Sequence, residues 1–199
     1  MMKSVSAILL LSVFLIPSIR SQDAVGIVER WLASNTGVER LKVDFRQKRT
    51  LKSLKVPIEQ AGTLWMEYET GRFRWQLGTP PKTIVVKKGD EITIMRTPLK
   101  RVEVRPAAST GGDSGGMAML GSGFPRSLSE FQKSYQILGM DQNGGFYRIM
   151  TRPLGSGAEG VESTAFIISA DKFTLRGMNL RLKDGSEVAT TFDRVTKNH

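Results

Sequence analysis

Residues 62–77 carry the pattern that most constrains the fold of this chain. In 62–68, and again in 72–77, apolar and aromatic residues alternate with residues that are mostly polar or charged. Alternation with a period of two, rich in aromatic residues, is typical of antiparallel strands that are buried on one face. Glu69-Thr70-Gly71 lies between the two runs, and its glycine can adopt the positive φ that a hairpin loop needs. The segment therefore predicts a hairpin whose apolar face must be covered.

The rest of the chain predicts more strands of the same kind. Alternation and short β-branched runs indicate strands near 41–51, 83–88, 91–95, 100–105, 135–140, 146–152, 163–168, 175–182 and 187–195. The connections are short, and Asn143-Gly144 and Asp184-Gly185 are strong hairpin signals. Short connections favour an antiparallel sheet over parallel strands joined by helices. We therefore expect a mainly β fold with one antiparallel sheet of about eleven strands.

Two helices are expected beside this sheet. The apolar residues of 23–34 have helical spacing, and Asp23 is predicted to cap that helix. Ser127, with Glu130 three residues later, forms a capping box that predicts a second, short helix. The segment before it, from 106 to 126, is rich in glycine, alanine and methionine. A long irregular segment inside a compact domain is usually functional or disordered.

The N-terminus has the features of a secretory signal peptide. Lys3 is followed by an apolar run over 5–16 and a small, polar exit over 17–21. This run is shorter than the ~20 apolar residues of a membrane-spanning helix. We expect residues 1–21 to be removed, which leaves one exported, soluble domain at 22–199. The chain has no cysteine, so it offers neither a disulfide nor the residue that carries a lipoprotein anchor.

The net charge of +10 favours contact with something anionic, such as lipid headgroups, a membrane face or an acidic partner. Nucleic acid is a poor candidate, because the basic residues alternate along strands and an exported chain does not meet it. We therefore expect transient contact with a membrane surface and no nucleic-acid partner. Most of these basic residues are expected to be ordinary solvated surface charges.

Two motifs resemble catalytic or cofactor signatures. Gly112-Asp113-Ser114-Gly115-Gly116 resembles the segment around a serine nucleophile, which needs a base nearby, but the one histidine is the terminal His199. The glycines of 155–160 fit a dinucleotide-binding motif, but a strand follows them where a helix is required. With one histidine, no cysteine and no calcium-loop spacing, no metal site and no cofactor are expected. A non-enzymatic protein is the favoured interpretation, and a hydrolase that uses Ser114 is the least favoured of the hypotheses.

Several short motifs follow one another in an informative order. Val43-Asp44-Phe45-Arg46-Gln47, Gly62-Thr63-Leu64-Trp65 and Arg72-Phe73-Arg74-Trp75 are followed by Pro80-Pro81 and a strand pair around Lys88-Gly89-Asp90. In order and spacing these elements resemble the outer-membrane lipoprotein carrier proteins, the LolA family. The resemblance covers nearly the whole chain after the signal peptide and indicates a divergent member. In that family an arginine that follows the tryptophan strand holds the lid. At the corresponding place this chain has residues 67–71, and Tyr68 is the residue nearest to the position of that arginine.

The resemblance implies an incomplete (half) antiparallel β-barrel whose concave apolar face is capped by helices. Such carriers take lipoproteins from an inner-membrane release complex, carry their acyl chains through the periplasm and deliver them to an outer-membrane acceptor. The residues expected to line the acyl cavity are Phe45, Leu64, Met66, Tyr68, Phe73 and Trp75. The expected lid is the segment 106–134, with the apolar residues Met117, Met119, Leu120, Phe124, Leu128 and Phe131.

The resemblance thus predicts a periplasmic carrier, active as a monomer, that moves lipoproteins or a related lipid from the inner to the outer membrane. An alternative is an interaction or regulatory module on the same fold, which senses a lipid or lipoprotein and does not carry it. Partner binding without lipid would favour this alternative, whereas co-purified acylated cargo would favour the carrier.

Overall fold

The computed structural model describes residues 21–107, 125–155 and 160–198. Within these residues the chain forms eleven β-strands, two α-helices and one short 3-10 helix, so the predicted mainly β fold is confirmed. The helices are α1 (Ser21–Ala33), α3 (Leu128–Ser134) and the 3-10 helix η1 (Thr97–Leu99). The strands of the first half are β1 (Arg40–Thr50), β2 (Ile58–Glu67), β3 (Arg72–Leu77), β4 (Thr83–Lys88), β5 (Glu91–Arg96) and β6 (Arg101–Pro106). Those of the second half are β7 (Tyr135–Asn143), β8 (Phe146–Pro153), β9 (Val161–Ser169), β10 (Leu175–Leu182) and β11 (Glu187–Lys197).

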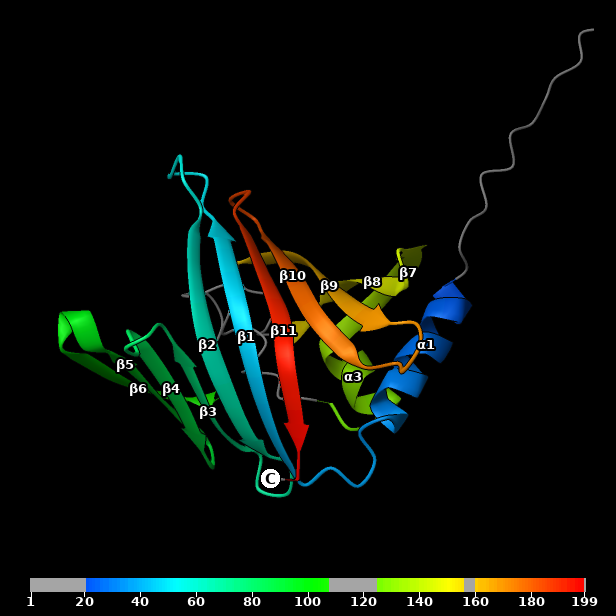
Figure 1. Ribbon diagram of the computed structural model, residues 1–199, viewed down its shortest axis with the longest axis horizontal. Coiled ribbons are helices and arrows are strands. Elements are labelled where there is room, and N and C mark those ends of the chain that lie inside the picture. The colour runs from blue at the N-terminus through cyan, green and yellow to red at the C-terminus, as the bar shows by residue number, and fades with distance from the viewer. Residues whose placement is uncertain (1–20, 108–124, 156–159, 199) are drawn as a thin grey trace, which may run out of the picture.

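All eleven strands belong to one antiparallel sheet, in the order β6-β5-β4-β3-β2-β1-β11-β10-β9-β8-β7. Strands that are consecutive in sequence lie side by side, except β6 and β7, which are at opposite edges. The first and last strands meet in the middle, where Phe45 pairs with Phe192. β6 and β7 are the two edges, so the sheet is open. It curves around α1 and α3, which lie on its inner side (Figure 1).

One face of the sheet, here called the inner face, carries the buried core. On β11, Phe192 pairs with Phe45 of β1, and Val188 pairs with Leu180 of β10. Phe192 and Val188 are four residues apart in a regular part of the strand, so their side chains point to the same side. The two halves of the sheet therefore bury their apolar residues on a single continuous face.

The inner face holds two apolar clusters. The first, called the β1–β5 cluster, consists of Val38, Leu41, Val43, Phe45, Leu64, Met66, Phe73, Trp75, Leu77, Val85, Ile92, Ile94 and Phe192. The second, called the helix-side cluster, consists of Ala24, Ile27, Val28, Trp31, Leu32, Phe131, Tyr135, Ile149, Val161, Phe166, Ile168, Met178, Leu180 and Val188. Both helices contribute to the second cluster, and they lie mainly against β7 and β8 and against each other.

Most local predictions agree with the structure. Gly71 turns the β2–β3 hairpin with φ of +63°, and Ser127 Oγ accepts a hydrogen bond from the backbone N–H of Glu130 at 3.2 Å, as the capping box predicts. Two details differ. Asp23 lies in the first turn of α1 and not at its N-cap, because the helix already includes Ser21. The β7–β8 turn is Gly144-Gly145, both with positive φ, because pairing between the two strands continues to Asn143.

Candidate functional site

Five of the six residues predicted to line a cavity lie together in the β1–β5 cluster. Phe45, Leu64, Met66, Phe73 and Trp75 are all buried on the inner face. Their contact follows from strand register, because Leu64 pairs with Trp75 and Met66 pairs with Phe73 across the β2–β3 hairpin. The period-two alternation of the sequence puts these side chains on one face, and the hairpin turn puts them side by side.

Aromatic stacking organises the centre of this cluster. The rings of Phe45 and Trp75 are stacked, with centroids 5.8 Å apart and an angle of 15° between their planes. Gly62 lies beside them on β2, where an added Cβ would collide with the Phe45 ring and the carbonyl oxygen of Gln76. The glycine of the Gly62-Thr63-Leu64-Trp65 motif therefore makes room for the ring of Phe45.

Tyr68, the sixth predicted residue, lies at the border of this cluster and is only half-buried. The guanidinium of Arg126 lies over its ring, 5.3 Å from the centroid. Burial raises the pKa of the Tyr68 phenol, and the charge of Arg126 offsets part of that rise. The phenol is therefore neutral at physiological pH, and Tyr68 presents an aromatic ring with a polar tip.

The predicted lid residues divide into two groups. Met117, Met119, Leu120 and Phe124 lie outside the described residues, as does Ser114 with its motif. Leu128 and Phe131 lie on α3 and pack in the helix-side cluster. Phe131 is fully buried, with its ring centroid 5.9, 5.1 and 5.1 Å from those of Trp31, Tyr135 and Phe166. These two residues therefore join α3 to α1 and the second half of the sheet.

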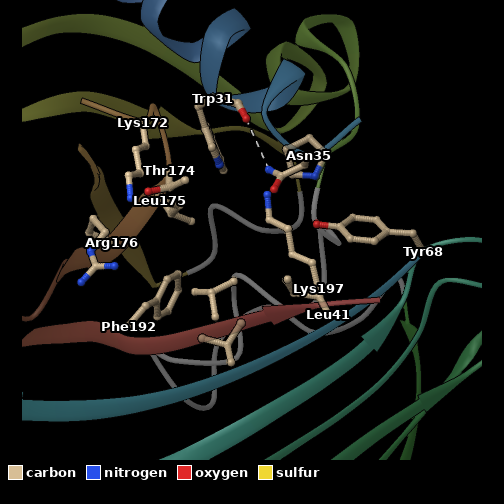
Figure 2. A pocket seen from close by; sticks show the side chains of 13 residues that line it. Trp31, Asn35, Leu41, Tyr68, Lys172, Thr174, Leu175, Arg176, Phe192 and Lys197 are labelled. Carbon is tan, nitrogen blue, oxygen red and sulfur yellow. Dashed lines mark hydrogen bonds between the residues drawn. The ribbon is translucent and has the colours of Figure 1, made fainter. Parts of the chain in front are cut away.

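A pocket of about 260 Å³ opens where the two clusters meet (Figure 2). Thirteen residues line it: Trp31, Asn35, Leu41, Val43, Tyr68, Pro125, Lys172, Thr174, Leu175, Arg176, Phe192, Val195 and Lys197. They come from α1 and the loop after it, from β1, β10 and β11, from the β2–β3 and β9–β10 loops, and from the segment just before α3. The pocket volume lies just below the ~300–1,000 Å³ of typical ligand sites, so it suits one headgroup or part of a chain.

The floor and the rim of the pocket differ in chemistry. Leu41, Val43 and Phe192 of the β1–β5 cluster form an apolar floor, and Trp31 adds an aromatic wall. The rim holds the cationic residues Lys172, Arg176 and Lys197, which are all exposed. Such a pocket can accept an amphiphile, with its apolar part inward and its polar part at the rim.

Among the predicted cavity residues, Tyr68 alone lines this pocket. The floor residues Leu41 and Val43 were not predicted as lining residues, although their alternation with Phe45 on β1 places them on the same face. Phe192 and the rim cations were not predicted either. Their positions depend on the pairing of β1 with β11 and on the β9–β10 loop, which no local pattern reveals.

Comparison with known proteins agrees with this architecture. The solved structures that are similar to most of the chain include two whose sequence identity is low, so that the similarity indicates a shared fold only. One is from Vibrio parahaemolyticus and provisionally named an outer membrane lipoprotein-sorting protein domain; it is 10% identical, with a TM-score of 0.52 over 90% of this chain and 94% of that one. The other is an uncharacterized conserved protein from Thermus thermophilus, 9% identical, with a TM-score of 0.53 over 89% of each chain.

A search of curated protein sequences found no significant match to this chain. Of the two described helices, neither is long and apolar enough to cross a membrane. The profile of the family described as outer membrane lipoprotein carrier protein LolA matches residues 36–199. That match begins in the loop after α1 and includes all eleven strands of the described sheet. The chain therefore belongs to the LolA family of outer membrane lipoprotein carrier proteins.

Proposed function

We propose that this protein is a periplasmic carrier that shields the acyl chains of lipoproteins, or of a related lipid, on the inner face of its sheet. It would take its cargo from an inner-membrane release complex and deliver it to an outer-membrane acceptor. The family to which the chain belongs includes non-enzymatic periplasmic lipoprotein carriers, which supports this proposal. Export would depend on the signal peptide expected at residues 1–21, and transient membrane contact on the basic surface.

The observation that carries the proposal is the continuous apolar inner face of the sheet. It extends from Ile94 on β5, through the Phe45–Trp75 stack, to the helix-side cluster around Ile149. α1 and α3 lie mainly over β7 and β8, at one end of this face. A curved sheet with one apolar face and a pocket at its middle provides the apolar side chains that a bound acyl chain would contact.

The energetics of transfer explain why a carrier is needed. Removing an acyl chain from water gains about 0.8 kcal/mol for each buried CH₂ group, so an unshielded chain does not cross an aqueous compartment at a useful rate. A carrier must provide comparable apolar contact and still release the chain. Aromatic rings together with Met66 provide contact surface, and methionine adapts to chains of different shape.

Native mass spectrometry of the protein purified from its own periplasm, with lipid extraction of any bound species, tests the proposal. We expect an acylated species bound to the wild type. Met66→Glu, which puts a charge on the inner face, should lose this species, because burying an unpaired charge is costly. Val104→Glu is the matched control, since Val104 is 60% exposed and should tolerate the change.

Whether the wild-type protein carries a bound acylated species tests the carrier function even if the Met66 variant fails to fold. A mass without ligand, unchanged after incubation with lipoprotein and with phospholipid, would contradict the carrier function. In that case, constitutive binding of a partner protein by the lipid-free form would indicate the regulatory module.

A further inference from the structure

We propose that the pocket between the two clusters binds the anionic headgroup of the cargo, so that the preferred cargo is an acyl lipid with a phosphate or carboxylate head. This inference rests on the proposed carrier function and specifies its cargo class. The features that support it are the charge of the rim, the way the rim cations are held, and the continuity of the pocket floor with the β1–β5 cluster.

The rim brings together three cations from different parts of the chain. Lys172 lies in the β9–β10 loop, Arg176 on β10 and Lys197 at the end of β11. Lys172 and Arg176 lie on one side of the pocket, and Lys197 lies beside Asn35 on the other (Figure 2). None of the thirteen described residues that line the pocket is acidic. An anion in this pocket therefore meets positive charge on two sides.

Lys197 is held in place by the helix beside it. Its Nζ donates a hydrogen bond of 2.8 Å to the backbone carbonyl of Ser34, just after the end of α1. The partial negative charge at a helix C-terminus favours a cation there. An ammonium group has three N–H donors, so this hydrogen bond leaves donors for a ligand. Lys197 is therefore positioned before any ligand arrives.

Asp193 is an acidic residue that interacts electrostatically with Arg176. A bidentate contact from Arg46, with N–O distances of 2.8–3.2 Å, engages this carboxylate. The hydrogen bond from Arg46 outweighs partial burial and, with the charges of Arg46 and Arg176, holds the pKa of Asp193 below its ordinary value. The single carboxylate of Asp193 therefore interacts with two guanidinium groups, those of Arg46 and Arg176, and it cannot balance both positive charges.

The pocket floor leads directly to the β1–β5 cluster. Phe192 lines the floor and pairs with Phe45, whose ring stacks on Trp75. A headgroup at the rim would thus have its acyl chain next to the aromatic centre of the inner face. A neutral diacylglyceryl group would leave the three cations without a counter-charge. A phosphate would accept hydrogen bonds from them and offset part of their charge.

The test measures binding of three single-chain amphiphiles that share one acyl chain, by titration calorimetry at low ionic strength. The probes are lysophosphatidylglycerol (anionic), lysophosphatidylcholine (zwitterionic) and monoacylglycerol (neutral), with glycerol phosphate as an anion that lacks a chain. We expect the anionic amphiphile to bind about tenfold more tightly than the neutral one. Added salt should reduce this preference, because the rim cations are exposed.

Two double variants test whether the rim cations cause the preference for the anionic amphiphile. Lys172→Glu combined with Arg176→Glu should reduce the anionic preference to near unity and leave binding of monoacylglycerol within about twofold, because the apolar floor is intact. Lys133→Glu combined with Arg148→Glu makes the same change in net charge at exposed sites on α3 and on the outer face of β8, and should keep the preference.

Three results would overturn the inference. Equal affinity for the three amphiphiles would contradict the headgroup site but would not contradict the carrier function. Glycerol phosphate binding as tightly as lysophosphatidylglycerol would indicate a site for a free anion. No binding of any amphiphile would contradict both the headgroup site and the proposed carrier.

Discussion

At the scale of single residues, Gly62 is a position on the inner face where packing leaves no room for a side chain. An added Cβ would collide with the Phe45 ring and the carbonyl oxygen of Gln76, and backbone cannot move aside as a flexible side chain can. We predict that Gly62→Ala lowers the free energy of unfolding by about 2–3 kcal/mol or more. Urea unfolding followed by circular dichroism measures the change.

Gly26 provides the matched control. It lies inside α1, and an added Cβ there would have no atom within 4 Å. Alanine at this helical position should raise stability by about 0.5–1 kcal/mol. Equal effects of the two substitutions would show that the space beside Phe45 does not explain the glycine at 62.

Residue patterns in the sequence predicted which side chains share a face but not everything that they meet. The alternation in 62–77 correctly grouped Leu64, Met66, Phe73 and Trp75, since side-chain direction in a strand follows from position alone. The rim cations of the pocket were not predicted. Lys172 and Lys197 are ordinary exposed charges in sequence, and only the tertiary fold brings them to one pocket.

At the scale of elements, α3 is attached mainly through Phe131, with Leu128 adding a partly buried contact. Phe131 is the one buried residue of this seven-residue helix, and its ring contacts those of Trp31, Tyr135 and Phe166. A helix of this length is not stable alone. We predict that Phe131→Ala lowers the free energy of unfolding by about 3–5 kcal/mol and raises amide hydrogen exchange throughout α3.

Gln132→Ala, at the exposed neighbouring position, should change stability by less than about 0.5 kcal/mol. If α3 were a separate element that moves independently of the helix-side cluster, Phe131→Ala would leave the hydrogen exchange of α1 unchanged. We expect faster exchange in α1 as well, because Trp31 packs against the same ring.

The elements themselves were largely predictable, because their signals are local. Glycine at positive φ marked the hairpin turns, as at Gly71 and Gly185, and the capping box marked α3. The position of the helices was not predictable from these signals. α1 and α3 lie mainly against β7 and β8, and this depends on which apolar faces fit one another after the sheet has formed.

At the scale of the whole molecule, the pairing of β1 with β11 decides the architecture. It joins residues about 150 positions apart, such as Phe45 and Phe192, and turns two meanders into one sheet. Strand propensity gives no information about such long-range pairing, since it acts within a few residues. The order of the short motifs was more informative, because it pointed to a family whose fold contains this arrangement.

The three tryptophans of the chain can report where on the whole molecule the acyl chain lies. Trp75 lies in the β1–β5 cluster and Trp31 lines the pocket. Trp65 is half-buried on the outer face, where it pairs with Arg74 and lies near Lys42. Because bromine quenches indole fluorescence only at contact distance, a brominated acyl chain reports which of these rings it touches.

The decisive measurement is the quenching of three variants, each keeping one tryptophan with the other two replaced by phenylalanine, after titration with a brominated lysophospholipid. We expect strong quenching of Trp75 and Trp31 and little or none of Trp65. Quenching of Trp65 alone, or of all three equally, would contradict an acyl site on the inner face.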